Sequence, residues 1–164
     1  MKRLYIVGGT MGVGKTTTCQ VLKKKLDRAV FLDGDWCWDA DPFQVTDETK
    51  AMVMDNICHV INNFLACAAY ENVIFCWVIH EQAILDEILS RLSLEDVDVV
   101  AVSLIVGAEA LTERLTRDVQ NGVRQEDVIK RSVARLPMYE FLDTVKIDVS
   151  DISPEQAANR IAAL

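Results

Sequence analysis

A glycine-rich segment near the amino terminus constrains the fold more than any other feature of the chain. It reads Gly9-Thr10-Met11-Gly12-Val13-Gly14-Lys15-Thr16 and matches the pattern G-x-x-x-x-G-K-[ST] at every position. Glycines let successive backbone N–H groups turn inward around an anion, and no side chain blocks close approach. Lys15 adds a charge for the β- and γ-phosphates, and Thr16 offers a hydroxyl to Mg²⁺. We therefore expect the eight residues, together with Thr17, to bind a nucleoside triphosphate.

The segments on either side of this motif have the order that a phosphate-binding loop requires. Residues 4–7 form a short apolar run typical of a buried parallel strand, and residues 15–26 carry Cys19, Leu22 and Leu26 at helical spacing. A helix that begins at the motif aims its unpaired N–H groups and the positive end of its dipole at a bound anion. The flanks therefore support the motif.

Apolar runs alternate with amphipathic segments along the rest of the chain. We expect further strands at residues 29–32, 72–79, 98–106 and 144–149, and helices at 46–70, 82–92, 108–117, from about 125 to Pro137, and from Ser153. The strands are almost continuously apolar, as in a parallel sheet that helices cover on both faces. The length of 164 residues, of which 51% are hydrophobic, suits one α/β domain over residues 1–164.

Composition argues against several classes of partner. The formal net charge of −8 disfavours nucleic acid over most of the surface. The five cysteines contain no C-x-x-C pair, so neither a disulfide frame nor a metal frame is indicated. No apolar run approaches the ~18 residues of a membrane span, and no signal-peptide stretch precedes the first strand. We expect a cytoplasmic monomer or homodimer whose partners are small molecules, with no nucleic acid and no membrane.

Three further segments resemble those of a known family. Phe31-Leu32-Asp33-Gly34-Asp35 is similar to the L-D-G-D segment of gluconate and adenylylsulfate kinases. Residues 111–117 are similar to the L-x-x-R-x-x-R segment that leads into a kinase lid, and residues 147–155 resemble the final strand, adenine-side loop and closing helix. Over nearly its whole length the chain is similar to the P-loop small-molecule and nucleotide kinases, which include gluconate, shikimate and adenylylsulfate kinases and chloramphenicol phosphotransferase.

This resemblance implies a fold and a mobile element. The fold is the P-loop NTPase three-layer αβα fold, with a five-stranded parallel sheet in order 2-3-1-4-5. A short lid is implied at about residues 117–125. The resemblance also implies that Arg114 flanks the adenine or the phosphates, and that Arg117 and Arg124 reach from the lid to clamp the transferred group. The alternative, strongest for Arg117, is that these arginines pair with acidic side chains on a solvated helix face.

The second expected strand ends in two carboxylates. In an open parallel sheet the ligand lies at the carboxyl ends of the strands, so Asp33 and Asp35 fall beside the phosphate-binding loop. Phosphoryl transfer to an alcohol needs a carboxylate near the attacking oxygen and a metal ion on the phosphates. We expect Asp35 to act as the general base, and Asp33, with Thr16, to hold Mg²⁺. The alternative is a polar turn around Gly34.

Three residues are candidates for the acceptor side of the site. His80 follows the third expected strand, where kinases of this group place acceptor contacts, and Trp36 and Trp38 suit the walls of a pocket for a ring. Each has a structural alternative. A histidine that closes a strand often serves only as a hydrogen-bonding group, and the two tryptophans could pack under the helix that follows.

Two motifs of related enzymes are absent. The third strand does not end in an aspartate, because Ile79 is followed by His80 and Glu81, which disfavours a switch GTPase or motor ATPase. Residues 46–70 contain no lysine or arginine except Lys50, and the adenylate-kinase signature for a nucleoside monophosphate is missing at residues 78–82. A doubly charged phosphate acceptor is therefore disfavoured.

These observations predict an enzyme that uses ATP and Mg²⁺ to move the γ-phosphate to a hydroxyl of a small molecule such as a sugar, polyol or antibiotic. The expected catalytic residues are Lys15, Asp35, Arg117 and Arg124, and the expected acceptor contacts are Asp35, Trp36 and His80. The alternatives are a nucleoside or nucleotide kinase, and a regulatory module that holds ATP without transferring it.

Overall fold

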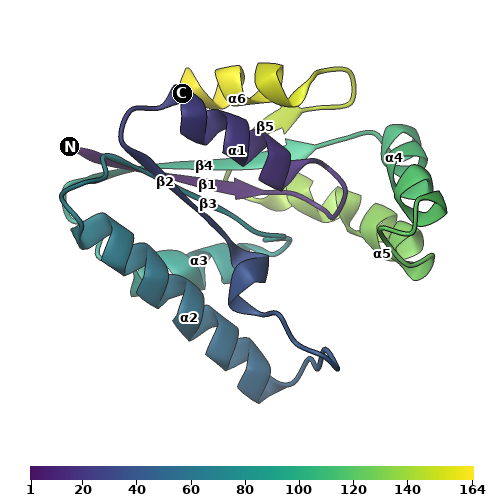
Figure 1. The fold of residues 1–164 in the computed structure, drawn as a ribbon, viewed down its shortest axis with the longest axis horizontal. Helices are drawn as coiled ribbons and strands as arrows, with labels where there is room; N and C mark the ends of the chain where they lie inside the picture. The colour runs from purple at the N-terminus through teal and green to yellow at the C-terminus, as the bar shows by residue number, and fades with distance from the viewer.

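The computed structural model describes residues 1–164 and is built on one five-stranded sheet in the order β2-β3-β1-β4-β5 (Figure 1). All four pairs of neighbouring strands are parallel. The strands are β1 (Lys2–Gly8), β2 (Ala29–Asp33), β3 (Asn72–Cys76), β4 (Val97–Ile105) and β5 (Val145–Asp148). The predicted fold class and strand order are confirmed.

Helices cover both faces of this sheet (Figure 1). The α-helices are α1 (Lys15–Lys25), α2 (Asp47–Ala66), α3 (Gln82–Arg91), α4 (Ala108–Gln120), α5 (Asp127–Arg135) and α6 (Pro154–Ala162). Two 3₁₀ turns, η1 (Gly34–Cys37) and η2 (Leu136–Phe141), follow β2 and α5. Helices α2 and α6 each begin with a capping box, in which Thr46 and Ser153 accept hydrogen bonds from Thr49 and Gln156.

Side chains of the central strand β1 alternate between two cores. Tyr5 and Val7 belong to the larger core, which lies under α1, α4, α5 and α6, whereas Leu4 and Ile6 belong to the core under α2 and α3. This alternation follows from the two-residue period of a strand that is buried on both faces. The result is a three-layer sandwich that holds the carboxyl ends of β1, β2 and β3 side by side.

Three element boundaries differ from the sequence prediction by three residues or more. Helix α2 ends at Ala66, four residues before the predicted end at 70. Strand β3 ends at Cys76, where its partner β2 also ends, instead of continuing to Ile79. Ile79 itself has a φ of 25°, which a strand cannot accommodate. Helix α4 continues to Gln120, three residues past the predicted end at 117, and so includes Arg117. Residues 118–120 therefore continue the helix, which ends before Asn121.

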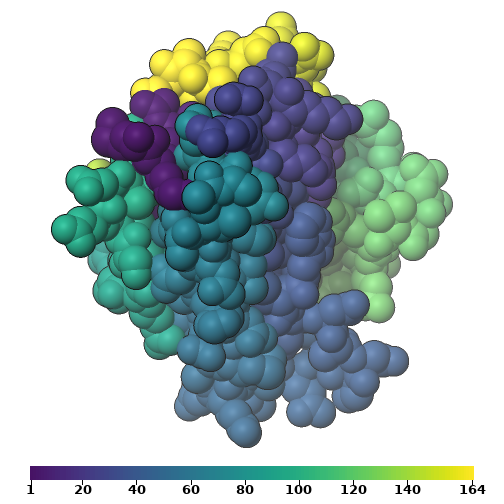
Figure 2. Space-filling view, turned by 60° about the vertical axis from the view of Figure 1, so that its left-hand side comes forward, coloured from purple at the N-terminus to yellow at the C-terminus, as the bar shows by residue number.

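The segment between η1 and α2 is the most exposed part of the fold near the second strand. It stands out from the body of the molecule in Figure 2, where it is drawn in blue at the lower right. Residues 39–48 are all exposed, including Phe43 and Val45. The ring of Trp38 contacts that of Phe43 at a centroid distance of 4.6 Å.

Candidate active site

The loop between β1 and α1 has the geometry of an anion site. Gly12 and Gly14 have φ values of 84° and 95°, a conformation that glycine adopts at little steric cost. Gly14 caps α1 without a side-chain hydrogen bond, and the first turn of that helix contains no acidic residue. A Cβ placed on Gly14 would meet nothing within 4 Å. The open N–H groups of this helix end therefore face space that a phosphate can fill.

Lys15 is held inside this loop. Its Nζ donates a hydrogen bond to the backbone oxygen of Thr10 at 3.0 Å. Burial lowers the pKa of Lys15, and the negative charges of Asp35 and Asp33 partly oppose that shift. A desolvated ammonium group with a single carbonyl partner is poorly compensated, and an anionic ligand would supply the missing charge.

A hydrogen bond joins the loop helix to the end of the second strand. The hydroxyl of Thr16 donates to Oδ2 of Asp33 at 2.6 Å, and Oδ1 of Asp33 accepts from the backbone N–H of Asp35 at 3.0 Å. Asp33 is 6% exposed. Both carboxylate oxygens therefore have partners, and the pair of Thr16 and Asp33 lies where the metal site was expected.

These residues suit Mg²⁺ better than a metal held by protein alone. No group of three or more His, Cys, Asp or Glu side chains in the chain is placed to hold a metal ion. Mg²⁺ usually keeps several waters and binds through one or two protein oxygens together with the phosphates of its nucleotide. The hydroxyl of Thr16 and the carboxylate of Asp33 are oxygens of that kind, so the residues present fit the ion.

Asp35 lies two residues after Asp33, and its pKa is influenced by Trp77, a residue that sequence reasoning missed. The raised pKa of Asp35 has partial burial as its largest cause and the charge of Asp33 as the next, while Lys15 and the side chain of Trp77 favour the charged form. The ring of Trp77 packs against Gly34, where an added Cβ would lie 2.6 Å from Cδ1 of the indole. No sequence signal marks Trp77, because its partner Gly34 lies in η1, more than 40 residues earlier in the chain.

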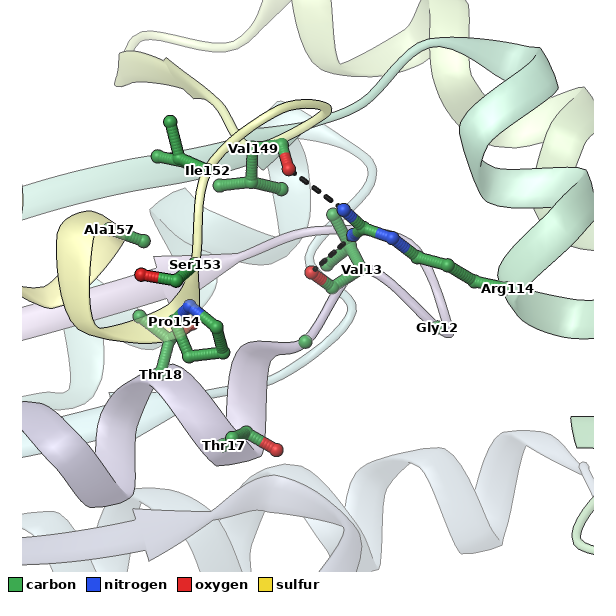
Figure 3. Close-up of a pocket in the computed structure, with 11 residues that line it drawn as sticks. Gly12, Val13, Thr17, Thr18, Arg114, Val149, Ile152, Ser153, Pro154 and Ala157 are labelled. Carbon is green, nitrogen blue, oxygen red and sulfur yellow. Dashed lines mark hydrogen bonds between the residues drawn. The ribbon is translucent and has the colours of Figure 1, made fainter.

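A cavity of about 290 Å³ lies behind the loop, between α1, α4 and the β5–α6 connection (Figure 3). Gly12, Thr17, Val149 and Pro154 are among its lining residues. The cavity is lined by Gly12, Val13 and Gly14 of the loop and by Thr17 and Thr18 of the first turn of α1, so it adjoins the anion site.

Arg114 borders this cavity and bonds to the backbone (Figure 3). Its guanidinium donates to the carbonyl oxygens of Val149 at 2.8 Å, Ser150 at 3.4 Å and Val13 at 3.5 Å. Arg114 thus joins the phosphate-binding loop to the β5–α6 connection. The implied role of Arg114 beside the adenine or the phosphates stays a prediction.

The two arginines of the predicted lid differ in their surroundings. Arg124 pairs with Asp118, with Nε 2.9 Å from Oδ2, and its charge acts on both Lys15 and Asp35. Arg117 is exposed on α4 and forms no ion pair. The structure therefore brings Arg124 toward the loop and the second-strand carboxylates and leaves Arg117 on the surface of the helix.

His80 and Trp36 take up different positions on the acceptor side. The side chain of His80 is 18% exposed, and its Nδ1 is buried without a hydrogen-bond partner. Burial lowers the pKa of His80, as does the nearby charge of Arg135. Trp36 is 56% exposed and meets Phe31 edge to face at 5.2 Å. Trp38 is partly buried and packs against the core under α2 and α3, as the packing alternative expects, whereas Trp36 is mostly exposed.

Comparisons with known proteins agree with this geometry. A family model described as an AAA domain matches residues 6–135. The chain belongs to this AAA domain family. The match includes the phosphate-binding loop, both second-strand carboxylates and the predicted lid of this AAA domain. A comparison with curated protein sequences finds no match.

Solved structures with the same fold include kinases and a resistance protein. A gluconokinase from Sinorhizobium meliloti 1021 has a TM-score of 0.70 at 18% identity, with 97% of this chain and 89% of that chain covered. The tunicamycin resistance protein of Deinococcus radiodurans has a TM-score of 0.67 at 22% identity, with coverage of 99% and 95%. APS kinase from Mycobacterium tuberculosis, in complex with AMPPNP and APS, has a TM-score of 0.68 at 13% identity, with coverage of 99% and 96%.

The resemblance to the P-loop small-molecule kinases is thereby confirmed, and the structural neighbours carry it at the level of the fold. No helix of the chain is long and apolar enough to cross a bilayer.

Proposed function

We propose that this AAA domain is a phosphotransferase that uses MgATP to phosphorylate a hydroxyl group of a small molecule. The observation that carries the proposal is the contact between the loop helix and the second strand. The 2.6 Å bond from Thr16 to Asp33 puts a metal-binding hydroxyl and a carboxylate together, and Asp35 follows two residues later. Transfer to an alcohol requires a carboxylate near the attacking oxygen in addition to the metal ligands, and Asp35 can supply it.

The chain's own residues supply nucleotide binding. The N–H groups at the start of α1 and the ammonium of Lys15 bind the β- and γ-phosphates, and the cavity behind Gly12 receives the nucleoside. Thr16 and Asp33 hold Mg²⁺, directly or through water. When bound, the ion neutralises the charge that develops on the phosphates during transfer.

On the acceptor side, Asp35 accepts the proton of the attacking hydroxyl. The raised pKa of Asp35 gives its carboxylate more affinity for a proton than an ordinary surface aspartate has. Trp36, which is exposed beside it, provides an apolar face for the acceptor. His80, with a buried and unpaired Nδ1, supplies a polar contact at the end of β3.

The predicted lid at residues 117–125 excludes water and brings a cation to the transferred group. Arg124 is the lid residue whose charge already reaches Lys15 and Asp35, so we assign it the principal role. Arg117 contributes if closure of the lid carries it inward from the surface of α4. Limiting water at this step reduces wasteful hydrolysis of ATP.

Names of the structural neighbours support small-molecule acceptors in this fold. One neighbour is a shikimate kinase in complex with shikimate, and another is described as a sugar kinase. The identities of 21% and 16% show the fold alone, so the acceptor of this chain must be found by experiment.

The proposal is tested by nucleotide binding and by acceptor-stimulated release of ADP. Calorimetry with MgATP should show binding that Lys15→Ala weakens by roughly 10–100-fold, the equivalent of one hydrogen bond to a charged group. Lys24→Ala, which removes a lysine from the far end of the same helix, should leave binding unchanged. A coupled assay over sugars, polyols, nucleosides and antibiotics should then find a compound that raises ADP release.

Two outcomes would contradict the proposal in different ways. If the wild-type protein binds neither MgATP nor MgGTP, the assignment of the loop is wrong. If MgATP binds but no hydroxyl compound stimulates turnover and Asp35→Asn changes nothing, the chain is a nucleotide-binding regulatory module.

A further inference from the structure

The buried side chain of Thr10 is not used by the proposed chemistry. Thr10 lies in the phosphate-binding loop and is 1% exposed. Its hydroxyl donates a hydrogen bond to the backbone oxygen of Ser132 in α5 at 2.9 Å. The two residues are 122 positions apart in the sequence. A loop that binds phosphate is therefore bonded directly to a helix that follows the predicted lid.

The carbonyl that accepts the hydrogen bond from Thr10 lacks its regular partner four residues later in the helix. In a continuous α-helix the N–H of Leu136 would donate to Ser132, but it donates to Val133 instead. This shorter-range hydrogen bond, from Leu136 to Val133, forms where the 3₁₀ turn η2 begins, and η2 has Pro137 in its first turn. Ser132 is only 2% exposed, so water cannot easily replace the threonine hydroxyl.

The same loop contacts the helix on the other side of the lid. A Cβ on Gly12 would lie 2.5 Å from Cδ2 of Leu115, so α4 packs closely on the loop. Arg114 of α4 also bonds to the carbonyl of Val13. The loop therefore touches both helices that flank residues 121–126, and Arg124 lies between them.

Lys15 connects the hydrogen bond between Thr10 and Ser132 to the phosphate site. Its ammonium donates to the backbone oxygen of the same Thr10 whose hydroxyl holds α5. A phosphate that engages Lys15 and the loop N–H groups restricts the backbone of Thr10, and hence the donor that α5 depends on. Coupling of this kind is reciprocal, so a docked α5 also favours the loop conformation that binds phosphate.

We propose that Thr10 is a positioning residue through which nucleotide in the loop orders α5 and places the lid arginine Arg124. This inference rests on the proposed function for the nucleotide site. It assigns the hydroxyl of Thr10 a role that the motif pattern does not specify, since the pattern leaves that position open.

Hydrogen exchange of the full-length protein, with and without MgADP, tests the inference. MgADP is the appropriate probe because it lacks the γ-phosphate that a lid arginine would contact directly. In the wild-type protein MgADP should slow exchange in the first turns of α1 and also in α5, while α3, which packs on the opposite face of the sheet, should not change. In Thr10→Val the slowing in α5 should fall by about fivefold or more, as expected for loss of one hydrogen bond, while that in α1 persists.

Two variants control for the substitution itself. Thr10→Ser retains the hydroxyl and should restore the slowing in α5. Ser132→Ala removes a side chain from the same contact but keeps the carbonyl, so α5 should still respond to MgADP. A role of Thr10 in stability alone would change the exchange of α5 equally with and without nucleotide, and would leave the response to MgADP unchanged.

The outcomes separate this inference from the proposed function. No slowing in α1 of the wild-type protein would mean that nucleotide does not bind and that the proposed function fails. Slowing in α1 without any in α5 would overturn the inference alone, and this result needs no variant to fold. An undiminished response of α5 in Thr10→Val would overturn it as well.

Discussion

Burial disfavours charge on two side chains of the site, Lys15 and Asp35. It lowers the pKa of the lysine and raises the pKa of the aspartate. Each group therefore stays partly uncompensated until a ligand of the right charge arrives, and MgATP brings both an anion for Lys15 and a cation near the carboxylates. Shifted pKa values of buried charged groups are typical of functional sites.

Replacement of Asp35 separates function from stability. Asp35→Asn should reduce kcat by about 10²–10⁴-fold, the usual contribution of a general base. The folded-state pKa of Asp35 is raised, so at neutral pH ionisation of this group costs folding free energy that the amide does not. The variant should therefore be more stable than wild type at pH 7. That gain should disappear as the pH falls below the pKa of aspartate in the unfolded chain.

Urea denaturation at pH 7 and at low pH measures this difference, and the coupled assay measures kcat. Asp39→Asn, a change in the exposed segment after η1, provides a comparison that should alter neither quantity appreciably. Equal turnover of Asp35→Asn and wild type would remove Asp35 from the role of base.

At the scale of elements, the site depends on how β2 and β3 end beside each other. Strand β2 pairs with β3 up to Asp33 and Cys76, and the next residues, Gly34 and Trp77, pack together. The chain after β3 then turns at Ile79, where Gly9 donates to the oxygen of Val78. The neighbouring strand ends thus hold Asp35 beside the loop.

A side chain at Gly34 should disturb that packing. Gly34→Ala places a Cβ 2.6 Å from the ring of Trp77, so the indole must move and the free energy of unfolding should fall by about 1–3 kcal/mol. Turnover should fall too, because the indole beside Asp35 is displaced. Gly107→Ala, whose Cβ would lie 3.6 Å from its nearest neighbour, should cost much less in urea denaturation. Equal losses in the two variants would argue against the Trp77 contact.

The lid arginines should differ in their effect on turnover. Arg124→Ala removes the lid charge that acts on Lys15 and Asp35, and should lower kcat by about 10²-fold or more with a small change in the KM for ATP. Arg117→Ala should cost less, because this side chain is exposed on α4. Steady-state kinetics of both variants measures the two losses of kcat. A larger loss for Arg117→Ala than for Arg124→Ala would show that Arg117, and not Arg124, has the principal role after lid closure.

At the scale of the whole molecule, contacts distant in sequence connect the site to the rest of the fold. Tyr139 of η2 is fully buried, and its hydroxyl donates to the oxygen of Val78 at 2.6 Å. That oxygen also accepts the longer bond from Gly9, at 3.4 Å. Through this one carbonyl the segment after α5 supports both the end of β3 and the phosphate-binding loop.

Removal of the Tyr139 hydroxyl tests that support. Tyr139→Phe should reduce the free energy of unfolding by about 1–2 kcal/mol, because the oxygen of Val78 is left with only the long bond. Urea denaturation measures the loss. Tyr70→Phe, at a tyrosine whose hydroxyl forms no hydrogen bond, should change stability by less than about 0.5 kcal/mol. A neutral result at Tyr139 would contradict the proposed support.

Local patterns predicted the elements well because their causes are local. The glycine motif, the apolar runs and the capping residues Thr46 and Ser153 act within a few residues, so the loop, the strands and the helix starts could be predicted. The strand order came from the family resemblance, because no local pattern encodes it. The same reasoning failed at Ile79, where a β-branched residue takes a left-handed φ that no sequence pattern signals.

The sequence by itself determined which chemical groups the site contains and that they gather at the carboxyl ends of parallel strands. Only the tertiary structure decided how they are paired: Thr16 with Asp33, Arg114 with backbone carbonyls, and Thr10 with the carbonyl of Ser132. The physical reason is that a local pattern limits the backbone over one or two turns, whereas the partner of a buried polar group depends on which distant segment the sheet brings within 3 Å.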